Sequence, residues 1–495
     1  MTRGWTVVGC AAAVLLGVTA CSGAPHPDAS PRRTTVSSAA AEPAPPAATD
    51  AVPAKLRAAV SRPEHDSVYF ERGDPRIDAL HYDLTLDWAP ATRTLAGHEV
   101  LTLRATANAA HVQLDLTDAL VVSRARVDGR PAGFEQAGDL LTVEGPFGAG
   151  TVYRIVLEYA GTPRPAATVS DRRDLDQVGF SISGDDQVTT LQEPVGAFTW
   201  YAANDQPSDK AFYDFTLRVP APWVGVANGQ LLSRGVNAGD TVTRWHLDQP
   251  GSSYLVALAF GPLTMTRAGD VDGVPITYWT PTGDAATLRR IAATPRLLAW
   301  VERRLGPYPF ASLGILVPEY FPTGMETQTM ISLSARFPAG LDMDAVLVHE
   351  IVHQWYGDEV TPSDWRDMWM NEGMAMYIQK VWEAERDGRT IERVIQELAP
   401  REAGFRRQFG PPGAYERRSF AQGNVYYGPA MMWDTLRRRV GDETFWRLVR
   451  TWPTVHRYGN ASREDLVAWF NEQTGQDLTS FFQAWLMNEK DPPLE

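Results

Sequence analysis

The chain has 495 residues, of which 44% are hydrophobic and 21% are charged, so it is long enough to form two or three domains with sizeable cores. Its formal net charge of -14 at pH 7 argues against a nucleic-acid-binding protein, because such proteins usually carry an excess of basic residues. The two cysteines, Cys10 and Cys21, both lie near the N-terminus, which excludes a disulfide framework in the rest of the chain.

The first 20 residues resemble a bacterial lipoprotein signal peptide. Arg3 supplies a positive start, and the segment from Val7 to Val18 is mostly apolar but too short to span a membrane. Small residues then precede Cys21, as in a lipobox, where the bond before the cysteine is cleaved and the sulfur is lipidated. We therefore expect residues 1–20 to be a signal peptide, and the mature protein to be lipid-anchored at Cys21 on the extracytoplasmic face of a cell membrane.

Residues 21–65 are expected to form a disordered tether after the lipidated cysteine. The segment is rich in Ala, Pro, Ser and Thr and has few large apolar residues, so it is not expected to build a core. Beyond it, no stretch of about 18 or more residues is apolar throughout. The lipid is therefore the expected membrane contact, and the sequence implies no partner protein.

Residues 66–262 carry the alternating pattern of half-buried strands, punctuated by turn signals such as Asp128-Gly129 and Asn228-Gly229. The segments with this pattern are His81–Trp88, Val112–Leu116, Tyr153–Tyr159, Phe212–Val219 and Tyr254–Phe260. Several short strands in succession predict a β-sandwich-like domain.

Residues 263–495 change in character, and most of the segments there have helical spacing. The expected helices are 285–305 with an interruption at Pro295, 344–356, 364–385, 425–439, 443–451 and 463–471. One short apolar strand is expected at Gly314–Val317. The fold class is therefore expected to be α+β with several domains: an all-β domain followed by a mostly helical one.

The strongest chemical signal is the sequence His349-Glu350-Ile351-Val352-His353. Residues four apart on a helix project from nearly the same face, so the imidazoles of His349 and His353 can bind one zinc ion, while Glu350 lies beside the metal as a general base. Glu372 follows His353 after 18 intervening residues and can supply the third ligand from a second helix. Two His and one Glu leave the fourth coordination position open, which is typical of a catalytic site with one Zn²⁺ per chain.

The residues around this motif resemble the zinc signature of the aminopeptidase N family of gluzincin metallopeptidases. The similar segments are His349–Asp358, Val360-Thr361, Trp365, Trp369 and Asn371–Gly373, and further upstream Gln192–Pro194, Trp200, Asn204–Pro207 and Asp209–Ala211. The resemblance covers about residues 66–490. The family usually has Asn where this chain has Asp358.

The resemblance implies a saddle-like N-terminal β-domain packed on a thermolysin-like catalytic domain. It also implies an exopeptidase motif, here Thr323-Gly324-Met325-Glu326-Thr327, in which the glutamate is kept and the first Gly and last Asn are replaced by Thr. Glu193 and Glu326 match the family's two positions for binding the substrate amine. Larger family members carry a further helical C-terminal domain, so this chain is expected to be a short form with a more open cleft.

The family's catalytic tyrosine lies in a Tyr-x-Lys/Arg-Gly context, where this chain has Tyr426-Tyr427-Gly428-Pro429. Counting back from the following Gly441-Asp442-Glu443 favours Tyr426 as the residue that holds the oxyanion. Because the basic residue is missing, Tyr427 is the alternative.

These residues together predict a zinc aminopeptidase that removes N-terminal residues from peptides with free N-termini. In that mechanism Glu350 takes a proton from water and passes it to the leaving amine. The alternatives are a thermolysin-like endopeptidase with an open cleft, a lipoprotein that binds peptides without cleaving them, and an epoxide hydrolase, an activity known in part of the family. The sequence leaves the preferred side chain, the natural substrate and the oligomeric state open.

Overall fold

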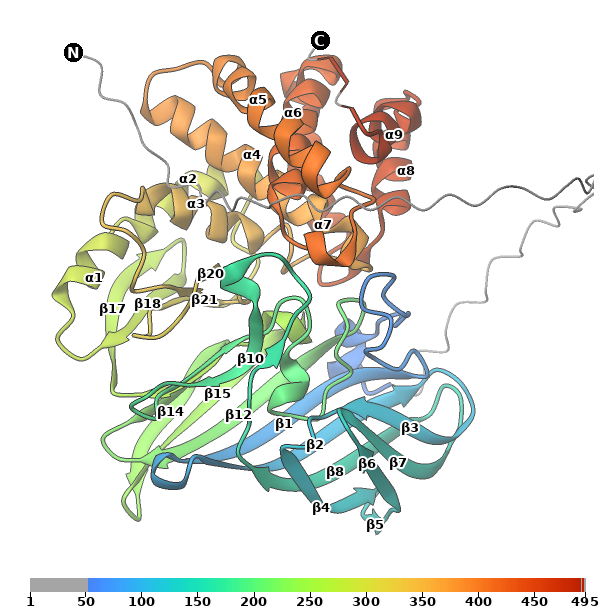
Figure 1. Cartoon of the computed structure of the whole chain (residues 1–495), viewed down its shortest axis with the longest axis vertical. Helices are drawn as coiled ribbons and strands as arrows, with labels where there is room; N and C mark the ends of the chain where they lie inside the picture. The colour runs from blue at the N-terminus through green and yellow to red at the C-terminus, as the bar shows by residue number, and fades with distance from the viewer. Residues whose placement is uncertain (1–51, 491, 494–495) are drawn as a thin grey trace, which may run out of the picture. The chain divides into compact units, whose positions relative to one another are not determined.

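The computed structural model of the protein describes residues 52–490 and 492–493. The expected signal peptide, the lipidation site at Cys21 and most of the expected tether lie outside the described residues. Strands dominate up to residue 281 and helices from residue 285 to residue 487, within one compact unit, which confirms the predicted α+β fold with an all-β part followed by a mostly helical one (Figure 1).

The largest sheet has eight strands in the order β14-β15-β12-β1-β2-β8-β4-β5. Its strands are β1 (Ile77–Ala89), β2 (Thr94–Ala105), β4 (Leu120–Val127), β5 (Arg130–Pro131), β8 (Val152–Gly161), β12 (Lys210–Pro220), β14 (Gln230–Asn237) and β15 (Asp240–Ser252). β1 and β12 pair in parallel, whereas the other neighbours pair antiparallel. The predicted alternation in β1 is confirmed, because Tyr82, Leu84 and Leu86 are all buried on one face.

Two smaller sheets complete the all-β part. The first has the order β3-β7-β6, and the second β13-β16-β11-β10-β9. Their strands are β3 (Ala109–Asp115), β6 (Phe134–Ala137), β7 (Leu140–Phe147), β9 (Ala166–Ala167), β10 (Gln177–Ile182), β11 (Val188–Leu191), β13 (Val224–Ala227) and β16 (Leu258–Gly261). Side chains from all three sheets share one hydrophobic core, which is the layered packing that the alternating sequence pattern predicts.

A further five-stranded sheet, β17-β18-β19-β21-β20, opens the second, mostly helical part of the chain. Its strands are β17 (Leu263–Val271), β18 (Val274–Pro281), β19 (Leu313–Leu316), β20 (Gly324–Met325) and β21 (Met330–Leu333). The hairpin β17–β18 is absent from the sequence prediction, because most of β17 is exposed or half-buried and lacks apolar alternation. β20 lies at the edge of the sheet and contains Gly324 and Met325 of the Thr323–Thr327 motif.

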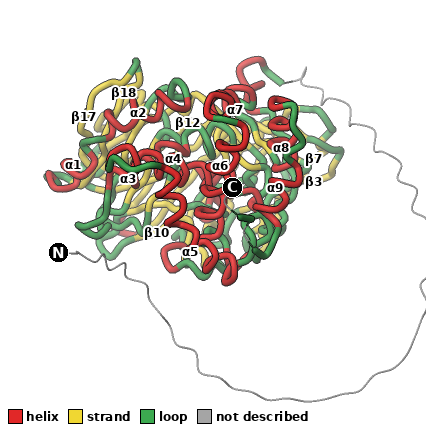
Figure 2. Tube along the Cα trace, turned by 90° about the horizontal axis from the view of Figure 1, so that it is seen from above, coloured by secondary structure: helices red, strands yellow, loops and turns green. Residues whose placement is uncertain are grey.

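The part of the chain that the structure describes has nine α-helices, and in the view from above most of them lie in front of the strands (Figure 2). They are α1 (Ala285–Ile291), α2 (Thr294–Leu305), α3 (Met343–His353), α4 (Trp369–Arg386), α5 (Ile391–Phe409), α6 (Gly423–Val440), α7 (Asp442–Val455), α8 (Arg463–Thr474) and α9 (Thr479–Met487). The expected break near Pro295 separates α1 from α2, because proline is accepted in the first turn of a helix but not in its interior. α5 and α9 are absent from the sequence prediction.

Short elements join these parts. They are the 3₁₀ helices η1 (Ala54–Ala59), η2 (Pro90–Thr92), η3 (Arg173–Leu175), η4 (Ala197–Thr199), η5 (Ser253–Leu255), η6 (Trp365–Asp367) and η7 (Arg417–Ser419), and the strand pair β22 (Thr361–Pro362) and β23 (Asn460–Ala461). Among the described helices, none combines the length and the apolar character that crossing a membrane requires.

The prediction of a disordered tether through residue 65 is wrong for its last part. η1 lies in that segment, and the Ser61 backbone NH donates to Asp78 Oδ1 over 3.0 Å. The buried residues that join the segment to β1 are Val52, Leu56, Ala59 and Leu80. Composition alone missed this, because a few scattered apolar side chains gain a stable position only when a strand offers them an apolar surface.

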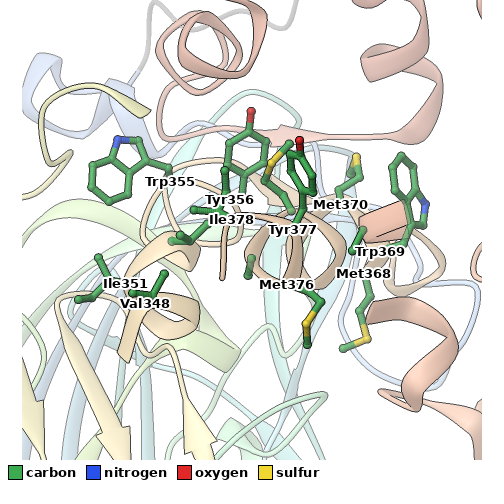
Figure 3. Close-up of a cluster of buried hydrophobic side chains, with 14 of the residues drawn as sticks. Val348, Ile351, Trp355, Tyr356, Met368, Trp369, Met370, Met376, Tyr377 and Ile378 are labelled. Atoms are coloured by element: carbon green, nitrogen blue, oxygen red, sulfur yellow. The ribbon is translucent and has the colours of Figure 1, made fainter. Parts of the chain in front are cut away.

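α3 and α4 pack against each other through buried side chains (Figure 3). Some of these side chains belong to the two helices, and others come from the residues directly after α3 or before α4. The labelled members are Val348, Ile351, Trp355, Tyr356, Met368, Trp369, Met370, Met376, Tyr377 and Ile378. This packing holds the first turn of α4 beside the last turns of α3, where the candidate metal ligands lie. α3 begins at the cap residue Asp342, whose carboxylate accepts a hydrogen bond from the backbone NH of Ala345.

Candidate active site

The three predicted metal ligands converge. His349 and His353 come from the last turns of α3, and Glu372 comes from the first turn of α4. Glu372 Oε2 lies 3.1 Å from His349 Nε2 and 3.4 Å from His353 Nε2, and all ligand atoms lie within 4.8 Å of one another. Within the described residues, this is the one group of His, Cys, Asp or Glu side chains that converges in this way.

The surroundings of the ligands suit a zinc ion. His353 Nδ1 lies 3.1 Å from the carbonyl oxygen of Tyr356, so its N–H donates there and its Nε2 keeps a free lone pair for a metal. Burial disfavours a charged Glu372, but the adjacent imidazoles outweigh it and hold the pKa of this carboxyl well below its usual range. Two imidazole nitrogens and an ionised carboxylate are a donor set that zinc prefers in catalytic sites.

Glu350 lies between the two histidines on α3, and its side chain faces β20. A Cβ added at Gly324 would lie 2.4 Å from Glu350 Oε1, so glycine is needed for the edge strand to pass this close. Burial, opposed by His353 and reinforced by the charges of Glu326 and Glu372, raises the pKa of Glu350 to about 8. A buried carboxyl that gains a proton readily is suited to general acid–base work.

Glu193 and Glu326 face the same cavity from two different parts of the chain. Glu193 follows β11 in the all-β part, and Glu326 directly follows β20. Burial together with the neighbouring Glu326 raises the pKa of Glu193 well above its usual range, and burial also raises the pKa of Glu326. Carboxylates buried side by side favour a cation between them, because each disfavours the other's charge.

Hydrogen bonds from the end of α3 hold the loop that contains Glu326. Gln354, directly after α3, donates through Nε2 to the carbonyl oxygen of Glu326 over 2.6 Å, and its Oε1 accepts from the backbone NH of Thr329 over 2.9 Å. β20 pairs with β21 in an ordinary antiparallel register, Gly324 opposite Leu333. The two Thr replacements in the motif therefore leave the edge strand in place.

The geometry separates the two candidate tyrosines. The Tyr426 hydroxyl donates to Glu372 Oε1 over 3.0 Å, and it accepts from Arg172 Nη1, also over 3.0 Å. The Tyr427 ring instead stacks on Phe405, with ring centroids 5.5 Å apart. Both side chains line the cavity. Only Tyr426 of the two forms a hydrogen bond with Glu372, a predicted metal ligand, as expected for a residue that acts next to the metal.

The cavity has a volume of about 430 Å³ and brings together residues from the all-β part, the edge strand and four helices. Its charged and polar lining consists of Arg172, Glu193, Thr323, Glu326, His349, Glu350, His353, Glu372, Gln422 and Tyr426. Its apolar lining includes Leu175, Phe337, Val346, Met376, Phe405 and Tyr427. All of the site residues predicted from the sequence, except Cys21, therefore meet in one place.

Sequence reasoning missed Arg172 and the role of Gln354. Arg172 lies in a stretch between β9 and β10 with no periodic pattern, so no local signal could have found it. Gln354 belongs to the quoted motif, but its amide contacts a loop almost thirty residues away in sequence, and only the tertiary structure shows that contact.

Two family models match this arrangement. Residues 78–255 match the peptidase M1 N-terminal domain, and residues 290–485 match the peptidase family M1 domain. The chain belongs to peptidase family M1. The aminopeptidase N resemblance, the expected fold and the expected zinc cofactor are thereby confirmed, and His349, His353 and Glu372 form the candidate zinc site.

The curated relatives that this chain resembles are named aminopeptidases. The chain is 24% identical over 342 residues to aminopeptidase M1-A of Oryza sativa subsp. japonica, covering 63% of this chain and 38% of that protein. It is 26% identical over 313 residues to aminopeptidase N of Streptomyces lividans, covering 58% and 36%. It is 22% identical over 446 residues to aminopeptidase N of Lactococcus lactis subsp. lactis, covering 82% and 50%. The chain thus spans between about a third and a half of the length of these relatives.

One solved structure matches this chain over nearly the full length of the solved protein. The M1 zinc metallopeptidase from Deinococcus radiodurans is 26% identical, with a TM-score of 0.78 over 87% of this chain and 98% of that one. A variant of that metallopeptidase has been solved with a Tyr-Ser-Ala substrate bound. The M1 peptidase described here therefore shares the fold and the zinc-enzyme class with a protein of similar extent.

Proposed function

We propose that this M1 peptidase is an aminopeptidase that hydrolyses the N-terminal residue from peptides with a free amine. The observation that carries the proposal is the placement of Glu193 and Glu326 in the same cavity as the zinc ligands. A protonated α-amine held between two buried carboxylates is stabilised by charge-assisted hydrogen bonds. A peptide held by its amine in this way presents its first peptide bond to the metal site.

The remaining residues divide the chemical work. Zinc, when bound by His349, His353 and Glu372, supplies a Lewis acid that polarises the scissile carbonyl and activates water. Glu350 accepts the proton of the attacking water and passes it to the leaving amine. The Tyr426 hydroxyl donates a hydrogen bond to the oxygen on which negative charge develops.

The comparisons support a peptide substrate. The metallopeptidase from Deinococcus radiodurans has been solved with a Tyr-Ser-Ala substrate, and the curated relatives are named aminopeptidases. Together with the two cavity glutamates, this favours exopeptidase action over the thermolysin-like alternative. A short peptide with a free N-terminus is the proposed substrate class.

The test compares matched peptides with free and acetylated N-termini, followed by mass spectrometry. Free-amine peptides should lose one residue at a time, and acetylated peptides should be nearly inert. Glu326→Gln should raise KM for free-amine peptides about 10- to 100-fold with zinc retained, because it removes a charge-assisted contact worth roughly 1.5–3 kcal/mol. Glu135→Gln, at an exposed position on β6, is the matched control and should leave KM unchanged.

Two results would contradict the proposal in different ways. Internal cleavage of both peptide sets at similar rates would indicate a zinc endopeptidase. Binding of peptides by the zinc-loaded protein without turnover would indicate a peptide-binding protein.

We further propose that the protein is lipidated at Cys21 and acts at the extracytoplasmic face of a bacterial membrane. The order of residues before Cys21 supports this, since it is similar to a lipobox. Cys21→Ala should leave the protein unprocessed or release it from the membrane fraction, whereas Cys10→Ala should change neither, because Cys10 leaves with the signal peptide. Unchanged membrane association and unchanged gel mobility of the Cys21 variant would count against lipidation.

A further inference from the structure

Arg172 reaches the active-site cavity from the all-β part of the chain. It lies between β9 and η3, and its Nη1 donates to the Tyr426 hydroxyl over 3.0 Å and to the carbonyl oxygen of Ala421 over 3.1 Å. Its Nε donates to Asp174 Oδ1 over 3.0 Å, and its Nη2 donates to Asp174 Oδ2. The guanidinium is therefore held on one side by a carboxylate and on the other by the start of α6.

The residues before Arg172 fasten the same segment to the loop before α6. Ser170 Oγ donates to the carbonyl oxygen of Phe420 over 3.1 Å, and the backbone NH of Asp171 donates to the carbonyl oxygen of Arg418 over 2.8 Å. Three consecutive residues of the all-β part thus bond to residues 418–426. Arg172 keeps a defined position relative to Tyr426 for this reason.

The chemistry of the two partners fixes the direction of the phenol proton. A guanidinium can only donate, so the Tyr426 oxygen must accept from Arg172. The single Tyr426 O–H then points elsewhere, and the carboxylate oxygen Glu372 Oε1 lies 3.0 Å away as an acceptor. Arg172 thereby directs this O–H towards the metal site, and a hydroxyl that accepts a hydrogen bond becomes a stronger donor.

Arg172 is the one permanently charged basic residue among the described residues that line the cavity. The same lining residues include the four glutamates Glu193, Glu326, Glu350 and Glu372. A fixed positive charge next to the hydroxyl that faces a developing oxyanion favours the transition state over the ground state.

We infer that Arg172 is a positioning residue for peptide hydrolysis, which orients and polarises the Tyr426 hydroxyl for donation to the developing oxyanion. The inference rests on the proposed aminopeptidase function. It assigns a catalytic contribution to the all-β part of the chain that is separate from amine binding by Glu193. It also explains why an arginine with a bidentate carboxylate partner lines this cavity.

A second role for Arg172, binding the C-terminal carboxylate of a short peptide, fits the structure less well. Asp174 already occupies two of the guanidinium N–H groups in a bidentate pair, and Tyr426 and Ala421 share a third nitrogen. The two roles differ in what they change, because carboxylate binding acts on KM and orientation of Tyr426 acts on kcat.

The test is a double-mutant cycle on zinc-loaded protein, with aminoacyl amides as substrates, which have no carboxylate. Its members are the natural protein, Arg172→Met, Tyr426→Phe and the double variant. Arg172→Met should lower kcat about tenfold or more, with KM within about twofold and zinc content unchanged. In the Tyr426→Phe background the same change should lower kcat less than about twofold, because the hydroxyl that Arg172 orients is gone.

Arg173→Met is the matched control, since Arg173 is an exposed neighbour on the same segment, and it should leave kcat unchanged. Arg172→Lys and Asp174→Asn guard against misfolding of the Met variant. Each should lower kcat by a smaller factor in the natural background and have almost no effect in the Tyr426→Phe background.

The inference is overturned if Arg172→Met lowers kcat by the same factor in both backgrounds, or if it raises KM without lowering kcat. Failure of the proposed function would look different: the natural, zinc-loaded protein itself would then release no N-terminal residue from free-amine peptides or amides.

Discussion

At the scale of single residues, the surroundings give four buried glutamates different roles in one cavity. Glu372 lies between two imidazoles, which keep its carboxylate charged and available to a metal. Glu350 has a buried side chain against β20, and its pKa is raised to about 8. Glu193 and Glu326 lie side by side from two different parts of the chain and are suited to a shared cation. Residue type alone would not distinguish these roles.

Glu350→Gln should therefore separate metal binding from proton transfer. The amide keeps the shape of the side chain but cannot accept the proton of the attacking water. We expect zinc retention, KM changed little, and kcat lowered on the order of 10²-fold or more. Elemental analysis and steady-state kinetics check this, with Glu464→Gln at an exposed position of α8 as the control. A zinc-loaded variant with near-normal kcat would remove Glu350 from the mechanism.

At the scale of elements, the close approach of α4 and α6 sets the distance between Glu372 and Tyr426. Gly373 follows Glu372, and a Cβ added at Gly373 would lie 2.3 Å from Pro429 Cβ. Pro429 lies one turn after Tyr426 on α6, and a proline ring cannot move aside without its backbone. A glycine at this point lets the helices approach until the Tyr426 hydroxyl reaches Glu372.

Gly373→Ala is therefore expected to be destabilising in spite of the better helix propensity of alanine. Propensity favours alanine by about 1 kcal/mol, whereas overpacking at a rigid contact costs about 1–3 kcal/mol. We expect a net loss of about 1 kcal/mol in the free energy of unfolding, measured by denaturant titration, together with a lower kcat as the helices separate.

Gly404→Ala in α5 is the matched control, because a Cβ there meets no atom within 4 Å. It should raise the free energy of unfolding by about 0.5–1 kcal/mol and leave kcat unchanged. Equal stabilisation by both substitutions would show that a Cβ at Gly373 is accommodated and that the close approach of α4 and α6 does not require glycine there.

At the scale of the whole molecule, the all-β part is hydrogen-bonded directly to the loop that follows α3. Lys210 on β12 is fully buried, and its Nζ donates to the carbonyl oxygens of Asp358 over 2.8 Å and Glu359 over 3.2 Å. Burial lowers the pKa of Lys210 to about 7, although the nearby carboxylates of Asp358 and Glu359 oppose the shift. One buried amino group thus joins the two parts of the chain next to the site.

Lys210→Met should lower the free energy of unfolding by about 1–3 kcal/mol at about pH 10.5, because it leaves two buried carbonyl oxygens without their N–H donor. Denaturant titration followed by far-UV circular dichroism and tryptophan fluorescence measures this loss. Lys55→Met, at an exposed position, is the control and should change stability little. A variant as stable as the natural protein would show that the contact contributes nothing.

The same variant isolates a pH dependence. The pKa of Lys210 is lower in the folded protein, about 7, than its ordinary value of 10.5, so the unfolded chain binds the additional proton between these values. The contribution of Lys210 to stability is therefore complete above about pH 10.5 and is lost as the pH falls towards 7. The natural protein should gain stability relative to Lys210→Met as the pH rises through this window.

The sequence by itself determined the elements whose signal is local. The four-residue spacing of His349 and His353 places both on one helix face, and the alternation of β1 fixes which of its side chains are buried. The order of motifs also predicted that Glu193, Glu326 and Glu372 would meet these histidines, because their type and surroundings resemble the family pattern.

Only the tertiary structure decided the features that depend on contacts between distant segments. The choice between Tyr426 and Tyr427 depends on how α6 is turned against α4, and sequence spacing does not contain that angle. The hairpin β17–β18 and the packed part of the expected tether have weak local patterns, because they gain their stability from neighbouring strands. Arg172 acts through a residue 254 positions away, so the physical reason for its place is visible only when both partners are seen together.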